Sequence, residues 1–216
     1  MNNLDTAKCT LCSSKCTHSY SKDKKREYFI CENCNVIFVP QQFYLNSIQE
    51  LKRYEKHNNS NTDIKYKDFL SRIVPPIIKF IKPGSIGLDF GCGPGPILKD
   101  IFQEYKIKIE EYDLYFKNNS YLLSKKWDFI VSTEVFEHLQ DPNTVFTKLW
   151  DLLNPEGVLA IMTSLTDYVN EFKSWYYKGD PTHITFFSKK SFHWLMSNKF
   201  GEIQFFDKDI IILVKY

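Results

Sequence analysis

The chain has 216 residues, enough for one core of about 150 residues and a small additional module. Its 28 basic and 26 acidic residues leave a net charge of +2, which argues neither for nor against a nucleic-acid partner. No apolar run approaches the roughly 20 residues of a membrane helix, and residues 1–5 lack the apolar stretch of a signal peptide. We therefore expect a cytoplasmic protein without a membrane partner and with reduced cysteines.

Two C-x2-C pairs near the N-terminus have the spacing of a metal site. The pairs are Cys9 and Cys12, and Cys31 and Cys34. Each tight turn brings two thiolates to one side, and two such turns supply the four ligands of a tetrahedral zinc ion. We expect a structural zinc site that holds residues 1–40 as a ribbon-like module. Cys16 could replace Cys9 or Cys12, but we prefer the symmetric pairs and treat Cys16 and His18 as spare residues.

This module raises the question of RNA docking. Its charges nearly balance once zinc and four thiolates are counted, whereas strong phosphate binding needs a clear positive excess. We interpret the basic stretch at residues 22–26 as the solvated tip of a hairpin. A structural role is therefore expected for the module, which could also act as a lid on a substrate pocket.

Residues 41–64 are polar and are expected to form a helical linker. Residues 66–81 carry apolar side chains at helical spacing, and Pro75-Pro76 is expected to kink or split that helix. A turn at residues 82–84 then leads into the first strand of a domain expected over residues 65–216.

The segment over residues 86–96, I-G-L-D-F-G-C-G-P-G-P, predicts a strand, a glycine turn and a helix. Three glycines follow the acidic Asp89 at alternate positions: Gly91, Gly93 and Gly95. Glycine allows a sharp turn and the close approach of a ligand, and Pro96 suits the first position of a helix. Free N–H groups at such a corner favour an anionic or polar ligand.

Other nucleotide-binding motifs fit this corner less well, because it lacks both the G-x-G-x-x-G spacing and the lysine of a phosphate loop. Asp113 closes the next expected strand, residues 108–113, where an acid suits the two ribose hydroxyls of a nucleoside. The corner resembles the first motif, D-x-G-C-G-x-G, of the class I S-adenosylmethionine (SAM)-dependent methyltransferases. The resemblance implies that SAM lies against Asp89, the three glycines and Asp113.

Further strands are expected at residues 127–132, 158–162, 203–206 and 210–214, and helices up to residue 105, from residue 142 and over 188–198. Asp141 is expected to cap the helix that Pro142 opens. This alternation predicts an α/β fold with a Rossmann-like, doubly wound, mostly parallel sheet that ends in an antiparallel hairpin. Only residues 114–126 separate the second strand from the next. We therefore expect the family's third strand unit to be shortened or missing, and we assign no adenine contact.

A second group of residues follows the strand at 127–132. In a helical turn Glu134, Glu137 and His138 share a face, at the sheet edge where substrates lie. This E-x-x-E-H turn, together with the later His183, is similar to small-RNA 3′-terminal 2′-O-methyltransferases and polyprenyl-catechol O-methyltransferases. The resemblance implies a divalent cation at these four residues, where it would stabilise a substrate oxyanion.

Two alternatives to that cation stay open. Glu137, His138 and His183 could act as catalytic residues without a metal, by accepting a proton from the substrate. In the simplest interpretation, Glu134 helps to shape the cofactor site and His183 caps a loop.

These features favour a SAM-dependent methyltransferase that acts on an oxygen of a small molecule or carbohydrate. One alternative is an RNA methyltransferase that uses the zinc module for docking. Another is a SAM-binding regulatory protein without turnover. The sequence leaves the oligomeric state open.

Overall fold

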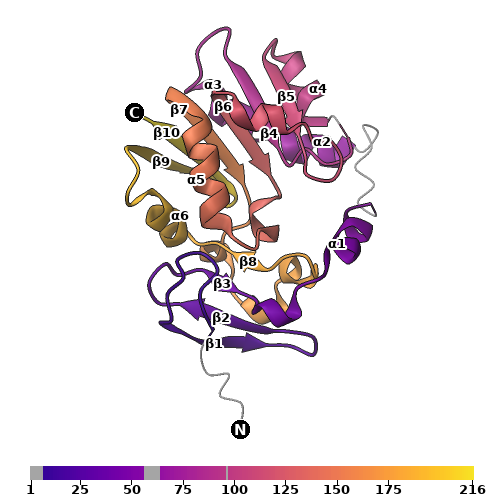
Figure 1. The fold of residues 1–216 in the computed structure, drawn as a ribbon, viewed down its shortest axis with the longest axis vertical. Coiled ribbons are helices and arrows are strands. Elements are labelled where there is room, and N and C mark those ends of the chain that lie inside the picture. Colours follow the sequence, from indigo (N-terminus) through magenta and orange to yellow (C-terminus); the bar gives the residue numbers. More distant parts are fainter. Residues whose placement is uncertain (1–6, 56–63, 96) are drawn as a thin grey trace.

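Two β-sheets organise the chain, and Figure 1 shows the smaller sheet below the larger one. The computed structural model describes residues 7–55, 64–95 and 97–216. Pro96, which we expected to open a helix, and residues 56–63 of the expected linker lie outside these ranges.

The larger sheet has six strands in the order β5-β4-β6-β7-β10-β9. They are β4 (Ile86–Phe90), β5 (Lys108–Tyr112), β6 (Trp127–Thr133), β7 (Leu153–Met162), β9 (Gly201–Phe206) and β10 (Ile210–Lys215). Strands β4 to β7 are parallel, whereas β10 is antiparallel to both β7 and β9. The predicted mostly parallel sheet with a terminal antiparallel hairpin is confirmed.

The connection between β5 and β6 is too short for another strand with its helices. It contains a 3-10 helix, Ser120–Ser124, and an isolated bridge between Asp113 and Lys117. Because nothing pairs beyond β5 in the order of the larger sheet, β5 is an edge strand. The expected loss of the third strand unit is confirmed.

The side chains of the central strands alternate between two hydrophobic clusters, one on each face of the larger sheet. In β7, Val158 and Ala160 belong to one cluster, and Leu159 and Ile161 to the other. The first face is covered by α2 (Ile64–Ser71), α3 (Val74–Ile78) and α4 (Ile97–Glu104), and the second by α5 (Pro142–Leu152) and α6 (Lys189–Met196). The sheet is therefore doubly wound, as predicted.

Two predictions about helix ends are also confirmed. The helical pattern at residues 66–81 divides into α2 and α3, and the two prolines lie in the first turn of α3. Helix α5 begins at Pro142, and the side chain of Asp141 accepts a hydrogen bond from the backbone N–H of Thr144. Proline is tolerated there because the first-turn N–H groups have no partner within the helix.

The smaller sheet joins the N-terminal module to a strand from far along the chain. Its strands are β1 (Thr17–Lys22), β2 (Glu27–Cys31), β3 (Ile37–Phe38) and β8 (Thr185–Phe186), in that order. Ile37 pairs with Phe186, and Phe38 pairs with Thr185. Cys9, Phe29 and Phe38 belong to the same hydrophobic cluster as α5 and α6, so the module shares its core with the larger sheet.

The tip of the β1–β2 hairpin is not fully solvated, and our expectation for residues 22–26 was wrong at one position. Lys22, Lys24 and Lys25 are exposed, but Arg26 is only 7% exposed. Its guanidinium donates to backbone carbonyls of the loop at residues 178–183. These hydrogen bonds offset the cost of burying the charged group.

Helix α1 (Ser47–Tyr54) forms within the expected linker and starts with a capping box between Asn46 and Gln49. Further 3-10 helices lie at Gln41–Phe43, Phe136–His138, Thr166–Tyr168, Phe172–Ser174 and Tyr176–Gly179. None of the helices in the described ranges has the length and apolarity of a membrane-spanning segment.

Candidate active site

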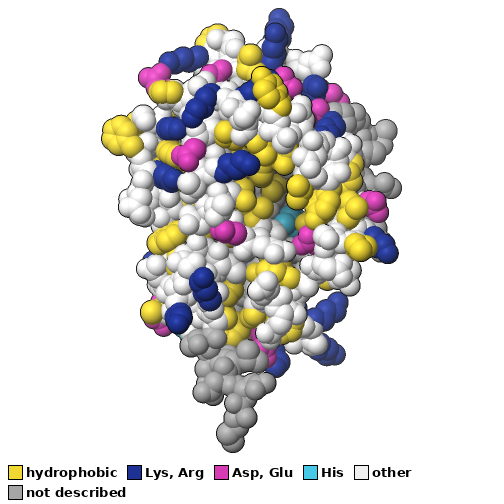
Figure 2. All heavy atoms as spheres, in the orientation of Figure 1, with side chains coloured by type: hydrophobic (Ala, Val, Ile, Leu, Met, Phe, Trp, Pro, Cys, Tyr) yellow, Lys and Arg dark blue, Asp and Glu magenta, His cyan; other side chains and the backbone are white. Residues whose placement is uncertain are grey.

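A cavity of about 1150 Å³ opens at the carboxyl ends of β4, β5 and β6. The glycine corner after β4 lines one part of it, and Glu134, His138 and His183 line another. Figure 2 shows the cavity as a hollow with hydrophobic side chains around it and a histidine inside. The residues that we expected at the cofactor and at the acceptor therefore share one cavity, except Glu137, which is fully buried and is not among the lining residues.

The backbone of the glycine corner requires glycine at two positions. Gly91 and Gly93 have φ angles of 83° and 68°, in the left-handed region that other residues rarely adopt. A Cβ on Gly91 would lie 2.4 Å from a methyl group of Val135, whereas a Cβ on Gly93 would meet nothing within 4 Å. The corner is thus tightly packed behind Gly91 and open at Gly93. Gly95 lies on the cavity wall.

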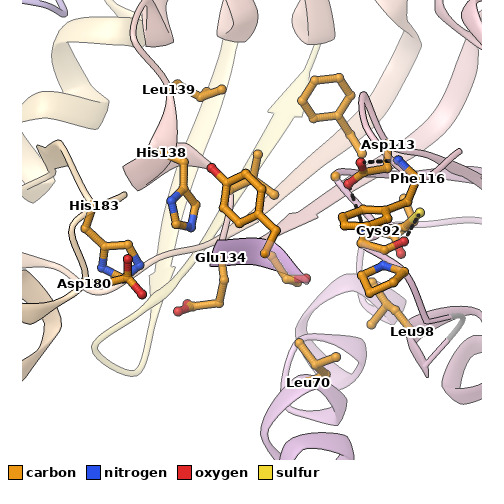
Figure 3. Close-up of a pocket in the computed structure, with 18 of the residues that line it drawn as sticks. Leu70, Cys92, Leu98, Asp113, Phe116, Glu134, His138, Leu139, Asp180 and His183 are labelled. Atoms are coloured by element: carbon orange, nitrogen blue, oxygen red, sulfur yellow. Dashed lines mark hydrogen bonds between the residues drawn. The ribbon is translucent and has the colours of Figure 1, made fainter. Parts of the chain in front are cut away.

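Asp113 ties the end of β5 to this corner. One carboxylate oxygen accepts a hydrogen bond from the backbone N–H of Gly93, at 3.0 Å. The other accepts from the N–H groups of Tyr115 and Phe116, at 2.8 and 3.0 Å. Figure 3 marks the bond to Phe116 with a dashed line. The carboxylate of Asp113 therefore lies on the cavity wall, with its position set by three backbone groups.

Asp89 is buried beside the same corner. It is 3% exposed, and within the described ranges its Oδ1 atom has no hydrogen-bond partner. Burial, followed by the nearby carboxylates of Glu111 and Asp113, raises the pKa of Asp89 to about 8. An unsatisfied polar atom next to open glycine backbone fits a site for a polar ligand, and these residues fit the groups of SAM.

Glu137 lies at the centre of a second group of residues, which we expected to face the acceptor. It is fully buried, and each carboxylate oxygen accepts a hydrogen bond. The hydroxyl of Tyr177 donates to Oε1 at 2.6 Å, and the hydroxyl of Thr163 donates to Oε2 at 2.9 Å. The two hydroxyls therefore hold the carboxylate in one orientation.

Two histidines lie beside Glu137, and in each of them Nδ1 faces a backbone carbonyl oxygen. Nδ1 of His138 lies 3.1 Å from the carbonyl oxygen of Thr182, and Nδ1 of His183 lies 2.7 Å from that of Tyr177. A carbonyl only accepts, so each Nδ1 carries the hydrogen and each Nε2 keeps its lone pair in the neutral ring. Both rings can therefore accept a proton or bind a metal ion through Nε2.

The three side chains converge. The ring centroids of the two histidines are 4.7 Å apart, and Nε2 of His138 lies 4.0 Å from Oε1 of Glu137. One potential ligand atom from each of Glu137, His138 and His183 lies within 4.8 Å of the others. Burial lowers the pKa of His183 to about 4, an effect that the Glu137 carboxylate opposes. His183 is thus neutral at neutral pH.

We expected Glu134 to belong to this group, but the structure places it outside. Only Phe136–His138 forms a helical turn, and it is of the 3-10 type, while Glu134 has a φ angle of 54°. The shared helical face assumed from the sequence is therefore absent. Figure 3 shows Glu134 between the two histidines and the residues of the glycine corner. Burial, followed by Glu137, raises the pKa of Glu134 well above its usual value.

The sequence analysis missed the two hydroxyls that hold Glu137. Thr163 directly follows β7, so the rule that functional side chains gather at the carboxyl ends of strands could have identified it. Tyr177 lies in a loop of short 3-10 turns, where no periodic pattern marks it. The sequence analysis also did not connect Arg53 of α1 with Asp180, whose carboxylate accepts two hydrogen bonds from it at 3.0 and 2.7 Å.

The four cysteines of the two C-x2-C pairs lie close together, and their sulfur atoms are all within 4.8 Å of one another. The sulfur atoms of Cys9 and Cys34 are 3.6 Å apart, and those of Cys12 and Cys31 are 3.4 Å apart. This arrangement fits the donor set of a tetrahedral zinc site. Cys16 is exposed, and His18 lies 3.2 Å from Glu32, so both stay outside the group as expected.

The strand order, the antiparallel hairpin and the glycine corner together define the fold of a SAM-dependent methyltransferase. A family model described as a methyltransferase domain matches residues 59–201. The chain therefore belongs to this family, and it is a SAM-dependent methyltransferase. A search of curated proteins found no match.

Several solved structures are similar to this chain. A SAM-dependent methyltransferase from Archaeoglobus fulgidus is 18% identical, with a TM-score of 0.54 over 69% of this chain and 94% of that one. The PH0226 protein from Pyrococcus horikoshii OT3 is 15% identical, with a TM-score of 0.51 over 71% and 92%. An O-methyltransferase family protein from Burkholderia thailandensis is 11% identical, with a TM-score of 0.48 over 77% of this chain. This chain spans 62% of the length of that protein.

Proposed function

We propose that this enzyme transfers the methyl group of SAM to an oxygen atom of a small molecule or carbohydrate. One observation carries the proposal. His138 and His183 keep Nε2 free beside the buried Glu137, in the same cavity as the glycine corner. The arrangement offers a proton acceptor within the cavity that the cofactor corner lines.

An oxygen acceptor explains why such a group would be present. An alcohol or phenol is a weak nucleophile until it loses its proton, whereas a neutral amine already has a free electron pair. In the proposed reaction Nε2 of His138 takes the proton, and Glu137, 4.0 Å away, stabilises the imidazolium that forms. His183 packs against the His138 ring and helps to orient the acceptor.

The cofactor side would be formed by Asp113, Asp89, Glu134 and the backbone of the glycine corner. SAM supplies a methyl group on a positively charged sulfonium, which needs little further activation. The residues of the chain then have to align the acceptor oxygen with that methyl group and exclude water. Burial raises the pKa of Asp89 and Glu134, and a cationic group bound beside them would favour their charged forms.

Glu137, His138 and His183 also form a donor set that would hold a divalent cation. A mixed histidine and carboxylate set suits Mn²⁺ or Fe²⁺. Hydrogen bonds from Nδ1 to backbone carbonyls are typical of histidines that bind metals through Nε2. A bound ion would supply stabilisation of the substrate oxyanion at this point.

The N-terminal cysteines are proposed to bind one structural zinc ion. Their close grouping supports this role, and the ion would tie together the two C-x2-C turns that pack against the core shared with the larger sheet. Its charge distribution supports a small acceptor over RNA, since Arg26 of the basic stretch packs inward. The buried polar side chains around Glu137 favour a catalytic role, because a protein that only binds SAM would not need them.

The proposal can be tested with SAM that carries a ¹³C-labelled methyl group. The purified enzyme would be incubated with this cofactor and fractions of small-molecule extracts, and methylated products would be identified by carbon NMR. We expect the label in an O-methyl group, whose carbon shift differs from those of N-methyl, S-methyl and C-methyl groups. Products labelled only on nitrogen, sulfur or carbon would refute the proposed acceptor class.

A further inference from the structure

We propose that Arg26 of the N-terminal module is a positioning residue that holds His183 in its orientation at the acceptor side. This inference rests on the proposed function, in which His183 contacts the acceptor. The module would thus stabilise the conformation of a loop that lies about 150 residues further along the sequence.

The guanidinium of Arg26 donates hydrogen bonds to four backbone carbonyl groups of one loop. Nη1 donates to the carbonyl oxygens of Pro181 and His183, at 3.2 and 2.9 Å. Nη2 donates to that of Asp180, at 3.2 Å, and to that of Lys178. The guanidinium is planar, and its donors are fixed relative to one another. It can therefore hold several carbonyls of this irregular loop at once, including that of Asp180, which also accepts from the backbone N–H of His183 at 3.2 Å.

Asp23 and Tyr28 hold Arg26 in place within the hairpin. Oδ1 of Asp23 accepts from the backbone N–H of Arg26 at 2.9 Å, and Oδ2 accepts from the hydroxyl of Tyr28 at 2.8 Å. The ring of Tyr28 lies under the guanidinium, with its centroid 5.4 Å from Cζ. Lys178 extends from the loop to Oδ2 of Asp23, at 3.0 Å. Hairpin and loop thus hold each other at several points.

The residue after His183 is also bonded to the module. The carbonyl of Ile184 accepts from the backbone N–H of Val39 at 2.9 Å, and strand β8 then pairs with β3. His183 therefore lies between two attachments to the module, Arg26 on one side and Val39 on the other. Its Nδ1 hydrogen bond to Tyr177 spans the loop that Arg26 holds, so the ring orientation depends on the shape of that loop.

Arg26 is not among the residues that line the cavity, whereas His183 is. Its effect on catalysis would therefore act through the loop. A purely structural arginine would stabilise the fold without changing the tautomer of one particular histidine. The orientation of the His183 ring separates these two roles.

The test is ¹⁵N NMR of the histidine side chains, with the His183 signals assigned by His183→Ala. In the unmodified chain we expect the Nδ1–H tautomer. In Arg26→Met we expect a mixture with the Nε2–H form, and about tenfold faster amide hydrogen exchange at residues 178–184. Lys24→Met, which removes an exposed charge from the same turn, is the matched control and should change neither readout.

If Arg26→Met does not fold, Arg26→Lys serves instead, because it keeps the charge but loses the planar set of donors. We expect it to restore the tautomer only in part. A folded Arg26 variant with the original His183 tautomer and slow exchange in the loop would overturn the proposal. Methyl transfer that survives His183→Ala would instead refute the role of His183 in the proposed function and leave the positioning effect measurable.

Discussion

The hydroxyl of Tyr177 lies 2.6 Å from a carboxylate oxygen of Glu137, and both groups are buried. The carbonyl of the same tyrosine accepts the hydrogen bond from Nδ1 of His183. One residue of an irregular loop therefore fixes two members of the proposed acceptor site. Changes at Tyr177 should affect the site even where they leave the glycine corner intact.

Replacing Tyr177 by phenylalanine should destabilise the protein. The variant leaves Oε1 of Glu137 without its donor in a buried position, which costs about 1–3 kcal/mol of unfolding free energy. Urea denaturation measures this change. Tyr176→Phe is the control, because Tyr176 is 81% exposed and should lose almost nothing. Equal stabilities of the two variants would show that the hydrogen bond contributes little.

Replacing Asp113 by alanine should weaken SAM binding. The carboxylate is proposed to bind the ribose hydroxyls, and it also holds Gly93 of the corner. The loss of such a charged hydrogen bond costs about 1.5–3 kcal/mol, or roughly a ten- to 150-fold increase in Kd. Titration calorimetry would measure it. Glu110→Ala removes an exposed acid from the same strand and should leave Kd unchanged.

The stability of the protein should depend on pH through Asp89. Its pKa is raised from 3.8 to about 8, so between these values the folded chain holds a proton that the unfolded chain releases. Stability therefore falls as pH rises through this range. Asp89→Asn removes the titration, and it should lose less stability than the unmodified chain between pH 5 and pH 8. An equal change in unfolding free energy between pH 5 and pH 8 in both proteins would contradict this assignment.

Replacing Cys31 by serine should remove zinc and lower the melting temperature of the whole chain. The effect should reach the larger sheet because Cys31 belongs to the same hydrophobic cluster as α5 and α6. Elemental analysis and thermal unfolding measure the two effects. Cys16→Ser is the control, because Cys16 is exposed. One zinc ion per chain in Cys31→Ser would argue against the four-cysteine site.

Several features of the fold could be predicted from the sequence because they depend on local chemistry. The spacing of Gly91 and Gly93 indicated a corner that only glycine can form, and both residues have positive φ angles. The short segment at residues 114–126, compared with the family pattern, predicted the missing third strand unit. Asp141 and Pro142 marked a helix start because both act on the backbone next to them.

Other features depend on contacts between distant segments. The left-handed conformation of Glu134 breaks the helical spacing that we assumed for the E-x-x-E-H turn. Arg26 seemed to be a surface charge, because its carbonyl partners lie about 150 residues further along the chain. The role of Tyr177 depends on its hydrogen bond to Glu137, which lies 40 residues earlier in the sequence. Sequence spacing carries no information on such pairings.

The central claim is that the histidines beside Glu137 serve the acceptor and not the cofactor. The most direct test compares turnover and SAM affinity of His138→Ala with those of His193→Ala, whose side chain is exposed on α6. We expect His138→Ala to lower kcat by about a hundredfold or more, with the Kd for SAM within about threefold of the unmodified enzyme. Unchanged turnover in His138→Ala, or a loss explained by weaker SAM binding, would contradict the account.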